Sequence, residues 1–402
     1  MAGGKAPEPA WPRVRWIEDG TQREACWYSA RGAPAPRRLR VVDDRTDADA
    51  AYGDACQGTG LLWRGDHRNA RQLLAALSRR AARHGAHRVD PRATPPGSSA
   101  MAQAFHRERQ ARAQRARTLG MLLVELDAAA RLVGQRSAPE VAGAVADALG
   151  SSAFGPASPP LLMSLRELQG MVGAWQWRLQ GIDVPAAGGR IHPHYGVFAP
   201  VRAEYVHLVA TAPLPAALAA QDFAVDVGTG TGVLAAVLAR RGVGRVLATD
   251  REPRALDCAR ENLARLGLAA RVEVRAADLF PTGRAALAVC NPPWLPGRPG
   301  SPLEHAIYDP DSRMLQGFLH GLVAHLAEGG EGWLILSDLA ERLGLRTRAE
   351  LLGRIEASGL HVVDRLEARP VHPRSRDEED PFHAVRSAEV TSLWRLAARR
   401  RT

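Results

Sequence analysis

Two short segments of this 402-residue chain hold residues whose types and spacing could do chemistry. The first reads Val225-Asp226-Val227-Gly228-Thr229-Gly230-Thr231-Gly232-Val233-Leu234, an apolar strand-like run that leads into three closely spaced glycines. Glycines at such a turn let the backbone pass close to a bound molecule, because no Cβ stands in the way. The second, Asn291-Pro292-Pro293-Trp294, follows another apolar run. The first segment suits a nucleotide-like cofactor, and the second suits chemistry on an amino group.

The glycine spacing narrows the kind of cofactor. A dinucleotide fingerprint G-x-G-x-x-G would need glycine at position 233, where this chain has Val233. The segment also lacks the G-K-[ST] ending of a phosphate-binding loop. Neither a pyrophosphate nor a triphosphate is therefore the expected occupant, although many nucleotide-binding proteins place glycines after a first strand.

Two aspartates follow the next two strand-like runs. Asp250 ends the second run, where a carboxylate can accept both hydroxyls of a ribose. Asp278 follows the third run and could accept a hydrogen bond from an adenine amino group. Each has a simpler interpretation, since Asp250 could cap a helix beginning near Glu252 and Asp278 could be an ordinary loop residue. Together with the glycine loop they form a constellation that chance rarely produces.

These motifs, in this order and spacing, resemble those of the class I S-adenosylmethionine-dependent methyltransferases, specifically the amino-methylating branch marked by [DN]-P-P-[FYW]. The resemblance rests on VDVGTGTG, on the aspartates at 250 and 278, and on NPPW, and it covers about residues 195 to 397. Similar members include release-factor glutamine methyltransferases and N6-adenine and N2-guanine methyltransferases, which share a small-methyltransferase domain. The resemblance implies an enzyme with S-adenosyl-L-methionine as its cofactor.

For the matching positions, the resemblance also implies roles. The Oδ1 atom of Asn291 and the carbonyl of Pro292 would accept the two N–H bonds of a planar amino group, so that its lone pair points at the sulfonium methyl. Proline fixes that carbonyl direction, and Trp294 would stack on the flat substrate. The implied catalytic residues are Asn291, Pro292, Pro293 and Trp294. The implied cofactor-binding residues are Asp226, Gly228, Thr229, Gly230, Gly232, Asp250, Asp278 and Asn291, and no metal is required.

Two further passages are similar to release-factor glutamine methyltransferases. Residues 197–205, VFAPVRAEY, resemble the lead-in that caps the cofactor in that family, although the acidic residues are not placed as in its usual P-R-P-E-T-E. The passage from Tyr308-Asp309-Pro310-Asp311 to Gly321-Leu322 resembles that branch's E-P…G-L passage. Both indicate kinship and leave the substrate open.

The elements that must position these residues begin near residue 222, where strand-like runs alternate with helical stretches. The runs lie at Phe223–Val227, Val246–Thr249, Val272–Val274, Ala286–Cys290, Trp333–Leu336 and Val362–Leu366. Such alternation predicts a parallel sheet with helices on both faces. A last run, Glu389–Leu396, lacks a convincing helix before it and predicts an antiparallel edge strand. The expected fold class is α/β, a Rossmann-like seven-stranded methyltransferase sheet preceded by a smaller mixed or mainly helical N-terminal region.

The first half of the chain is expected to divide into separate segments. Residues 1–20 read as a flexible tail, 21–95 as an N-terminal basic region, 100–188 as a mainly helical substrate-recognition or accessory region, and 195–397 as the catalytic domain. Residues 66–82 read as an amphipathic helix with leucines at 73, 74 and 77 on one side. Residues 91–99, PRATPPGSS, read as a linker.

The formal net charge of +10 is unevenly distributed. Residues 1–200 carry 27 Lys and Arg against 18 Asp and Glu, whereas the rest carries 26 against 25. A basic surface attracts polyanions, so RNA or an RNA–protein assembly is an expected partner. Codon bias toward arginine is the competing explanation, since Lys5 is the only lysine. The arginine-rich stretch 101–117 could likewise be a solvated helix face or an RNA-facing helix.

Bulk composition bounds the class of protein. With 46% hydrophobic and 24% charged residues, the chain has the balance of a soluble globular protein. No apolar run reaches the roughly 18 residues needed to cross a bilayer, and the first residues lack the apolar core of a signal peptide, so a cytoplasmic location is expected. The four cysteines show neither zinc-ligand nor disulfide spacing and read as small buried apolar residues.

The sequence leaves the substrate open among several classes. The first hypothesis is a nucleic-acid base, most plausibly an rRNA or tRNA adenine N6 or guanine N2, because the N-terminal half is basic. The second is a glutamine side-chain amide of a protein, supported by the two passages above. A small-molecule substrate and a non-catalytic RNA-binding factor are the remaining alternatives. The insertion 369–387 contains the acidic run DEED, which would repel RNA if it faced the substrate.

Overall fold

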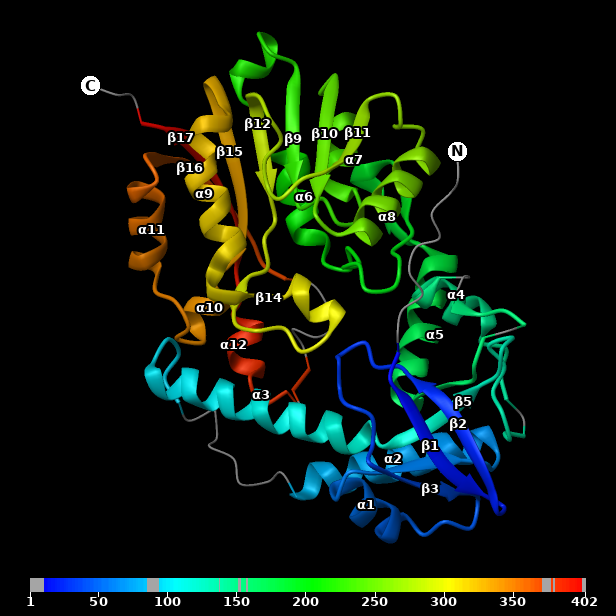
Figure 1. The fold of residues 1–402 in the computed structure, drawn as a ribbon. Coiled ribbons are helices and arrows are strands. Elements are labelled where there is room, and N and C mark those ends of the chain that lie inside the picture. Colours follow the sequence, from blue (N-terminus) through cyan, green and yellow to red (C-terminus); the bar gives the residue numbers. More distant parts are fainter. Residues whose placement is uncertain are drawn as a thin grey trace. The chain divides into compact units, whose positions relative to one another are not determined.

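The computed structural model describes residues 11–84, 94–136, 138–150, 153–156, 158–370, 377–378 and 380–399 (Figure 1). It divides the chain into two compact units, unit 1 with residues 1–88 and 107–176 and unit 2 with residues 89–106 and 177–402. Part of the expected tail (1–10), part of the expected linker (91–93) and most of the basic and acidic run in the 369–387 insertion (371–376 and 379) lie outside the described residues. No described helix is long and apolar enough to cross a membrane.

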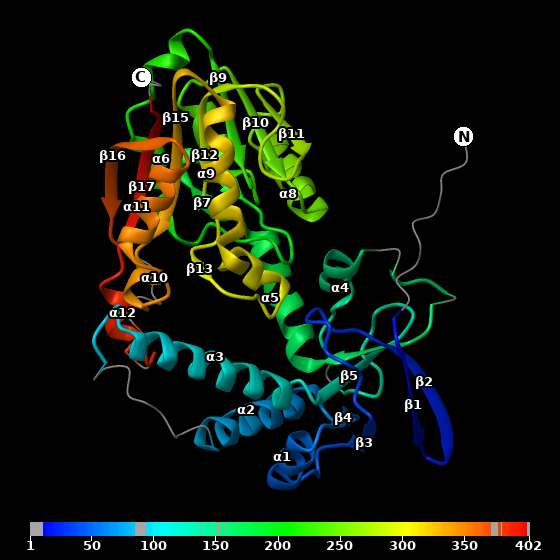
Figure 2. The same ribbon diagram turned by 60° about the vertical axis from the view of Figure 1, so that its left-hand side comes forward.

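Unit 1 is built on a six-stranded mixed sheet with the order β1-β2-β6-β5-β4-β3 (Figure 2). Its strands are β1 (Arg13–Glu18), β2 (Thr21–Trp27), β3 (Arg38–Val42), β4 (Thr59–Trp63), β5 (Leu122–Leu126) and β6 (Leu161–Ser164). Its helices are α1 (Ala48–Cys56), α2 (His67–His84), the C-terminal part of α3 (Ser99–Leu119), α4 (Ala142–Leu149) and most of α5 (Leu165–Gln180). Every residue of β5 and of β6 is buried, as expected for mainly apolar strands in the centre of a sheet, and the buried residues include Glu125 and Ser164.

This architecture differs from the expected segments in two respects. Residues 13–18, placed in the expected tail, form β1 because Val14 and Trp16 alternate with polar residues and pack into the core of the sheet. The sheet also combines strands from both sides of residues 91–99, since β4 pairs with β5. The predicted helix at 66–82 is present as α2, with its leucines buried.

Unit 2 is built on a seven-stranded sheet with the order β11-β10-β9-β12-β15-β17-β16. Its strands are β9 (Phe223–Val227), β10 (Arg245–Asp250), β11 (Val272–Ala276), β12 (Ala285–Cys290), β15 (Leu326–Ser337), β16 (Leu360–Ala368) and β17 (Thr391–Ala398). Its helices include α6 (Ala203–Thr211), α7 (Val233–Arg240), α8 (Pro253–Arg265), α9 (Arg313–His325), α10 (Leu339–Arg342), α11 (Arg348–Ala357) and α12 (His383–Ser387). Two small sheets, β7 (Ile182–Val184) with β8 (Gly189–Ile191) and β13 (Leu295–Pro296) with β14 (Tyr308–Asp309), complete the unit. The predicted seven-stranded α/β sheet is thus confirmed.

The large sheet buries both faces. Ala224, Val246 and Val289 point to one face, which α6, α7 and α8 cover, whereas Val225 and Leu247 point to the other, which α9 and α11 cover (Figure 1). This alternation follows from the two-residue period of a strand. The prediction for the last strand was partly wrong: β17 is antiparallel, but it lies between β15 and β16, and β16 is the edge. The connection from β16 to β17 carries the chain back beside β15, so both sides of β17 are paired.

The N-terminal part of α3 belongs to unit 2. Met101, Ala104 and Phe105 pack with Leu295 and Tyr308 in one apolar cluster. Their spacing of three and four residues places them on a single helix face. A segment expected in an accessory region therefore supports the strand β13, which directly follows Trp294.

Candidate active site at the carboxyl ends of the strands

The residues singled out from the sequence meet at one edge of the large sheet. In the strand register, Val227 lies beside Thr249 of β10 and beside Cys290 of β12, and all of these strands are parallel. The residues that follow Val227 and Cys290 in the chain are Gly228 and Asn291, so the glycine loop and the NPPW segment leave the sheet side by side. This edge is where α/β sheets bind ligands.

Positive backbone angles explain the glycines of the loop. Gly228, Gly230 and Gly232 have φ values of 72°, 54° and 81°, in the left-handed region that other residues disfavour. A Cβ on Gly228 would collide with the methyl group of Met314, whereas nothing lies within 4 Å of a Cβ built on Gly230. The loop therefore has open space next to Gly230, as a cofactor cradle requires.

Asp226 organises the loop from inside. Its side chain is 1% exposed, and its Oδ2 accepts hydrogen bonds from the Thr229 hydroxyl at 2.6 Å and from the Ala235 N–H at 3.0 Å. Burial raises the pKa of Asp226 to about 6, although these two hydrogen bonds oppose the shift. The carboxylate thus ties the glycine loop to the first turn of α7.

Asp250 joins this loop to the next strand. Its Oδ2 accepts from the Gly230 N–H at 3.1 Å, and its Oδ1 accepts from the Glu252 N–H at 3.0 Å. The second bond is not a helix cap, because the N-cap of α8 is Glu252 and no described side chain caps the first turn of this helix. A carboxylate has about four acceptor positions, so Asp250 keeps lone pairs for a ligand. Burial raises its pKa, which is the expected penalty for a carboxylate without a paired cation.

Asp278 lies two residues beyond β11 and is exposed. Its Oδ2 forms an ion pair of 2.7 Å with Arg313 at the start of α9. The next residue, Leu279, has a φ of 73° and its carbonyl accepts from the Thr249 hydroxyl at 2.8 Å. The backbone after Asp278 is therefore held against the end of β10.

The NPPW segment has an internal hydrogen bond that the sequence did not predict. The indole N–H of Trp294 donates to Asn291 Oδ1 at 2.8 Å. Because only the amide oxygen can accept this bond, it fixes which way the amide faces. One lone pair of Oδ1 remains for a substrate N–H.

A guanidinium covers one face of Trp294. The Cζ atom of Arg202 lies 4.6 Å from the centre of the indole ring. Arg202 pairs with Glu204 at 2.6 Å and with Glu389 at 3.0 Å, and these carboxylates are 2% and 4% exposed in their side chains. Because Arg202 and Glu204 belong to the predicted lead-in 197–205, that segment supports Trp294 directly. The indole ring can offer a substrate only the face that Arg202 leaves free.

The segment 309–315 lies next to Gly228 and contains strained backbone. Asp309 is buried, and its two oxygens accept from the backbone N–H groups of Met314 at 3.0 Å and Leu315 at 3.1 Å. Between them, Asp311 and Ser312 have φ values of 55° and 53°, which non-glycine residues rarely adopt. Such strain concentrates at ligand-binding sites. This is the passage that resembles E-P…G-L, and it places Met314 against Gly228.

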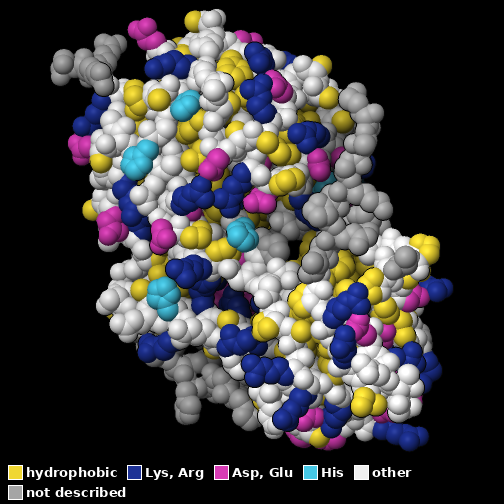
Figure 3. Space-filling view, in the orientation of Figure 1, with side chains coloured by type: hydrophobic (Ala, Val, Ile, Leu, Met, Phe, Trp, Pro, Cys, Tyr) yellow, Lys and Arg dark blue, Asp and Glu magenta, His cyan; other side chains and the backbone are white. Residues whose placement is uncertain are grey.

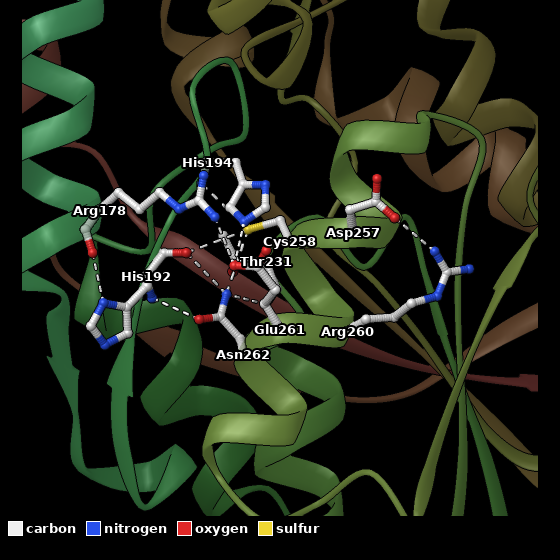
Figure 4. A network of polar contacts seen from close by, with 9 residues as sticks. All are labelled: Arg178, His192, His194, Thr231, Asp257, Cys258, Arg260, Glu261 and Asn262. Atoms are coloured by element: carbon white, nitrogen blue, oxygen red, sulfur yellow. Dashed lines mark hydrogen bonds and ion pairs between the residues drawn. The ribbon is translucent and has the colours of Figure 1, made fainter. Parts of the chain in front are cut away.

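A polar network anchors the far end of the loop (Figure 4). The buried Asn262 of α8 donates to the carbonyls of Thr231 at 3.1 Å and His192 at 3.3 Å, and it accepts from the His192 N–H at 2.8 Å. Next to it, His194 contacts Glu261 at 3.0 Å, and Arg178 pairs with the same carboxylate at 2.8 Å. Asn262 was not among the residues predicted from the sequence. The signal for it is an amide on the apolar face of α8, between Ala259 and Leu263.

The loop and its neighbours fit a nucleoside-like cofactor. Open space at Gly230, the half-buried acceptors of Asp250 and the nearby end of β12 form one continuous edge. Among the described residues, no group of three or more His, Cys, Asp or Glu side chains is placed to hold a metal ion. Of the cysteines, Cys26, Cys258 and Cys290 are buried as expected, whereas Cys56 is exposed.

Comparison with known proteins finds similarity in the part of the chain that contains this edge. Residues 189–344 match the family model described as methyltransferase small domain. Over 163 residues the chain is 34% identical to the release factor glutamine methyltransferase of Cereibacter sphaeroides, covering 37% of this chain and 56% of that protein. Over 212 residues it is 30% identical to the ribosomal protein L11 methyltransferase of Sorangium cellulosum, covering 47% and 60%.

The fold was also compared with solved structures, among them the ribosomal protein L11 methylase from Lactobacillus delbrueckii subsp. bulgaricus. The match covers 48% of this chain and 77% of the methylase chain at 17% sequence identity, with a TM-score of 0.32. The chain spans little more than half of each of the two curated relatives described above. What the chain and the family model share is concentrated in unit 2, at the site built above. Residues 189–344 are therefore similar to a methyltransferase small domain, and this stretch contains both the glycine loop and the NPPW segment.

Proposed function

We propose that this protein is an N-methyltransferase that acts on the planar amino nitrogen of an RNA base. The observation that carries the proposal is the placement of Asn291 beside the glycine loop, with its amide oxygen oriented by Trp294. When bound, S-adenosyl-L-methionine supplies an electrophilic methyl group. An exocyclic nitrogen attacks poorly, because its lone pair is delocalised into the ring.

In this proposal the chain's own residues prepare that nitrogen. Asn291 Oδ1 and the carbonyl of Pro292 accept its two N–H bonds and favour a pyramidal nitrogen whose lone pair faces the glycine loop. Pro293 restricts the backbone after that carbonyl. Trp294 orients the Asn291 amide and presents one ring face to the base, while Arg202 holds its other face.

The cofactor is assigned to the loop and its carboxylates. Gly228, Thr229, Gly230 and Gly232 form the cradle, and Asp226 keeps the cradle in shape from beneath. Asp250 would accept the ribose hydroxyls through lone pairs that its backbone bonds leave free. Asp278 would reach the adenine amino group after its carboxylate turns from the exposed Arg313.

The charge of unit 1 favours RNA as the substrate. Unit 1 contains 24 Lys and Arg residues against 16 Asp and Glu, whereas unit 2 contains 29 against 27. A surplus of eight positive charges on one unit increases encounters with a polyanion.

The second candidate is N-methylation of a glutamine amide in a protein. Its specific support is the 34% identity to a release factor glutamine methyltransferase. An amide nitrogen presents the same two N–H bonds to Asn291 as a base does, so the catalytic segment serves both substrates equally well.

Labelled-methyl transfer distinguishes the two candidates. Purified protein and methyl-labelled S-adenosylmethionine are incubated with extract of a strain that lacks this protein, and the extract is separated into RNA, protein and small molecules. The proposal predicts label in RNA, recovered after nucleoside digestion as an N-methylated base. Label confined to the protein fraction would refute the RNA substrate and support the glutamine candidate.

A further inference from the structure

We infer that unit 1 binds RNA phosphates in an arginine-rimmed hollow formed by α2, the end of α3 and the start of α5, and this inference rests on the RNA substrate proposed above. The hollow has a volume of about 680 Å³. Leu74 and Leu119 are its buried apolar members, and Arg68, Arg71 and Arg166 are its charged ones. All of its lining residues belong to unit 1.

The charge of this hollow is uncompensated. None of its lining residues among the described part of the chain is acidic. Within the same described residues, no carboxylate lies within ion-pair distance of the guanidinium groups of Arg68, Arg71 and Arg166. None of these three guanidinium groups forms a hydrogen bond with another described side chain. Three exposed guanidiniums that line one hollow without a described carboxylate attract an anion to it.

Other arginines near the hollow are paired with carboxylates. Arg64 is bound by Glu18 and Glu125, and Arg80 of α2 is paired with Asp49 of α1. On α3, Arg115 is paired with Glu108. Arg68, Arg71 and Arg166 differ from these arginines because they line the hollow without a carboxylate partner among the described residues.

The carboxylate nearest in sequence to Arg166 is turned elsewhere. Glu167 accepts from the backbone N–H of Ala30 and is largely buried there. Desolvation and the positive charge of Arg31 lower the pKa of Arg166. A bound phosphate would oppose this shift.

The polar and apolar lining together favours a nucleic acid over a free phosphate ion. Gln72 and Gln169 add amide groups beside the guanidiniums, and both can donate to phosphate or base oxygens. The leucines offer an apolar surface against which a sugar or base can lie. Guanidiniums stack on bases and form forked bonds to phosphates, so they suit both parts of a nucleotide.

On the face drawn in Figure 3, dark blue arginine and lysine side chains lie in both halves of the view. By sequence count, unit 1 has a surplus of eight positive charges and unit 2 a surplus of two. The hollow is thus a concave point on a surface that already attracts polyanions.

The test measures RNA binding without methyl transfer. The full chain is titrated against a fluorescein-labelled, mixed-sequence single-stranded RNA oligonucleotide at several salt concentrations. The variant Arg68→Gln/Arg71→Gln removes two of the rim charges, and Arg38→Gln/Arg79→Gln removes two exposed charges from unit 1 outside the hollow. Circular dichroism and urea denaturation of each variant report whether unit 1 is folded.

We expect the rim variant to bind RNA at least about tenfold more weakly and to reduce the slope of log affinity against log salt by about 1.4, since each single-strand phosphate contact contributes about 0.7. The control variant should change both quantities much less. Equal losses in the two variants would overturn the inference, as would tighter capture of a polyglutamate peptide than of RNA. If the hollow binds RNA but no label enters RNA, the proposed substrate fails while the binding site stands.

Discussion

Replacing Gly230 by alanine tests the cofactor cradle most sharply. Gly230 has a φ of 54°, and nothing lies within 4 Å of a Cβ built on it. The change therefore costs the free protein only the left-handed backbone penalty for a residue with a Cβ, about 1–2 kcal/mol. The new methyl group would stand in the open space that we assign to the cofactor. We expect affinity for S-adenosylmethionine to fall at least about tenfold, which corresponds to about 1.4 kcal/mol.

Gly267→Ala is the matched control. Gly267 has a φ of 70° and likewise has nothing within 4 Å of its Cβ position, but it lies between α8 and β11 at the amino end of the strands. Its backbone penalty should be similar, and its effect on the cofactor should be negligible. Urea denaturation measures the first quantity and titration calorimetry with S-adenosylmethionine the second. If the Gly230 variant binds the cofactor as tightly as the Gly267 variant, the cradle is wrongly placed.

Three further changes follow from the same site. Between about pH 4 and 6, Asp226 binds a proton in the folded protein but not in the unfolded chain, so its ionisation lowers the free energy of unfolding by about 3 kcal/mol as the pH rises through that window. Asp226→Asn should remove this pH dependence when urea denaturation is measured at pH 4.5 and 7. An unchanged pH dependence in the variant would contradict this prediction. Trp294→Phe keeps an aromatic ring but removes the N–H that orients Asn291. Methyl transfer should slow about tenfold in kinetic assays, while cofactor affinity measured by calorimetry stays unchanged. Transfer at the wild-type rate would exclude the orienting role of Trp294. Asn262→Ala leaves the Thr231 carbonyl without its hydrogen-bond donor, so the free energy of unfolding of unit 2 should fall by about 2–3 kcal/mol in thermal or urea denaturation. A decrease below about 0.5 kcal/mol would mean that the polar network around Asn262 is dispensable.

The catalytic sheet could be predicted closely because its signals are local. Each of β9, β10 and β12 is a short apolar run followed at once by a glycine, aspartate or asparagine, so the run and the chemistry mark the same strand end. The position of β17 could not be predicted in this way. Strand order depends on which neighbours accept its backbone hydrogen bonds, and nothing in residues 389–396 records that choice.

Unit 1 shows a different limit. Its strands β4 and β5 pair although 58 residues separate the end of one from the start of the other, and β6 has only four residues. Short apolar runs of this kind look alike in helices and strands, so their pairing emerges only from the assembled core. The predicted division into tail, basic region and helical region was based on the residue composition of each segment. The bounds of unit 1 depend instead on contacts between segments that are distant in sequence.

Within the site, the structure places the residues singled out from the sequence at one edge of the sheet and adds supporting contacts that the sequence did not indicate. The bond from Trp294 to Asn291, the stacking of Arg202 and the anchoring by Asn262 join segments that are distant in sequence or depend on side-chain direction. Met101 and Phe105 lie far upstream in the sequence but pack against residues of β13 and β14. Such contacts leave only weak traces, a polar residue on an apolar face or an apolar pair at helical spacing.

The central claim is that Asn291 accepts the N–H bonds of a planar nitrogen and does not hold the fold or the cofactor. The most direct test compares Asn291→Ala with the wild-type protein in two measurements on the same sample, cofactor affinity by calorimetry and labelled-methyl transfer to RNA. The account predicts cofactor affinity within about threefold of wild type and a loss of transfer of at least about 100-fold, or about 2.7 kcal/mol of transition-state stabilisation. Transfer at the wild-type rate in this variant would contradict it.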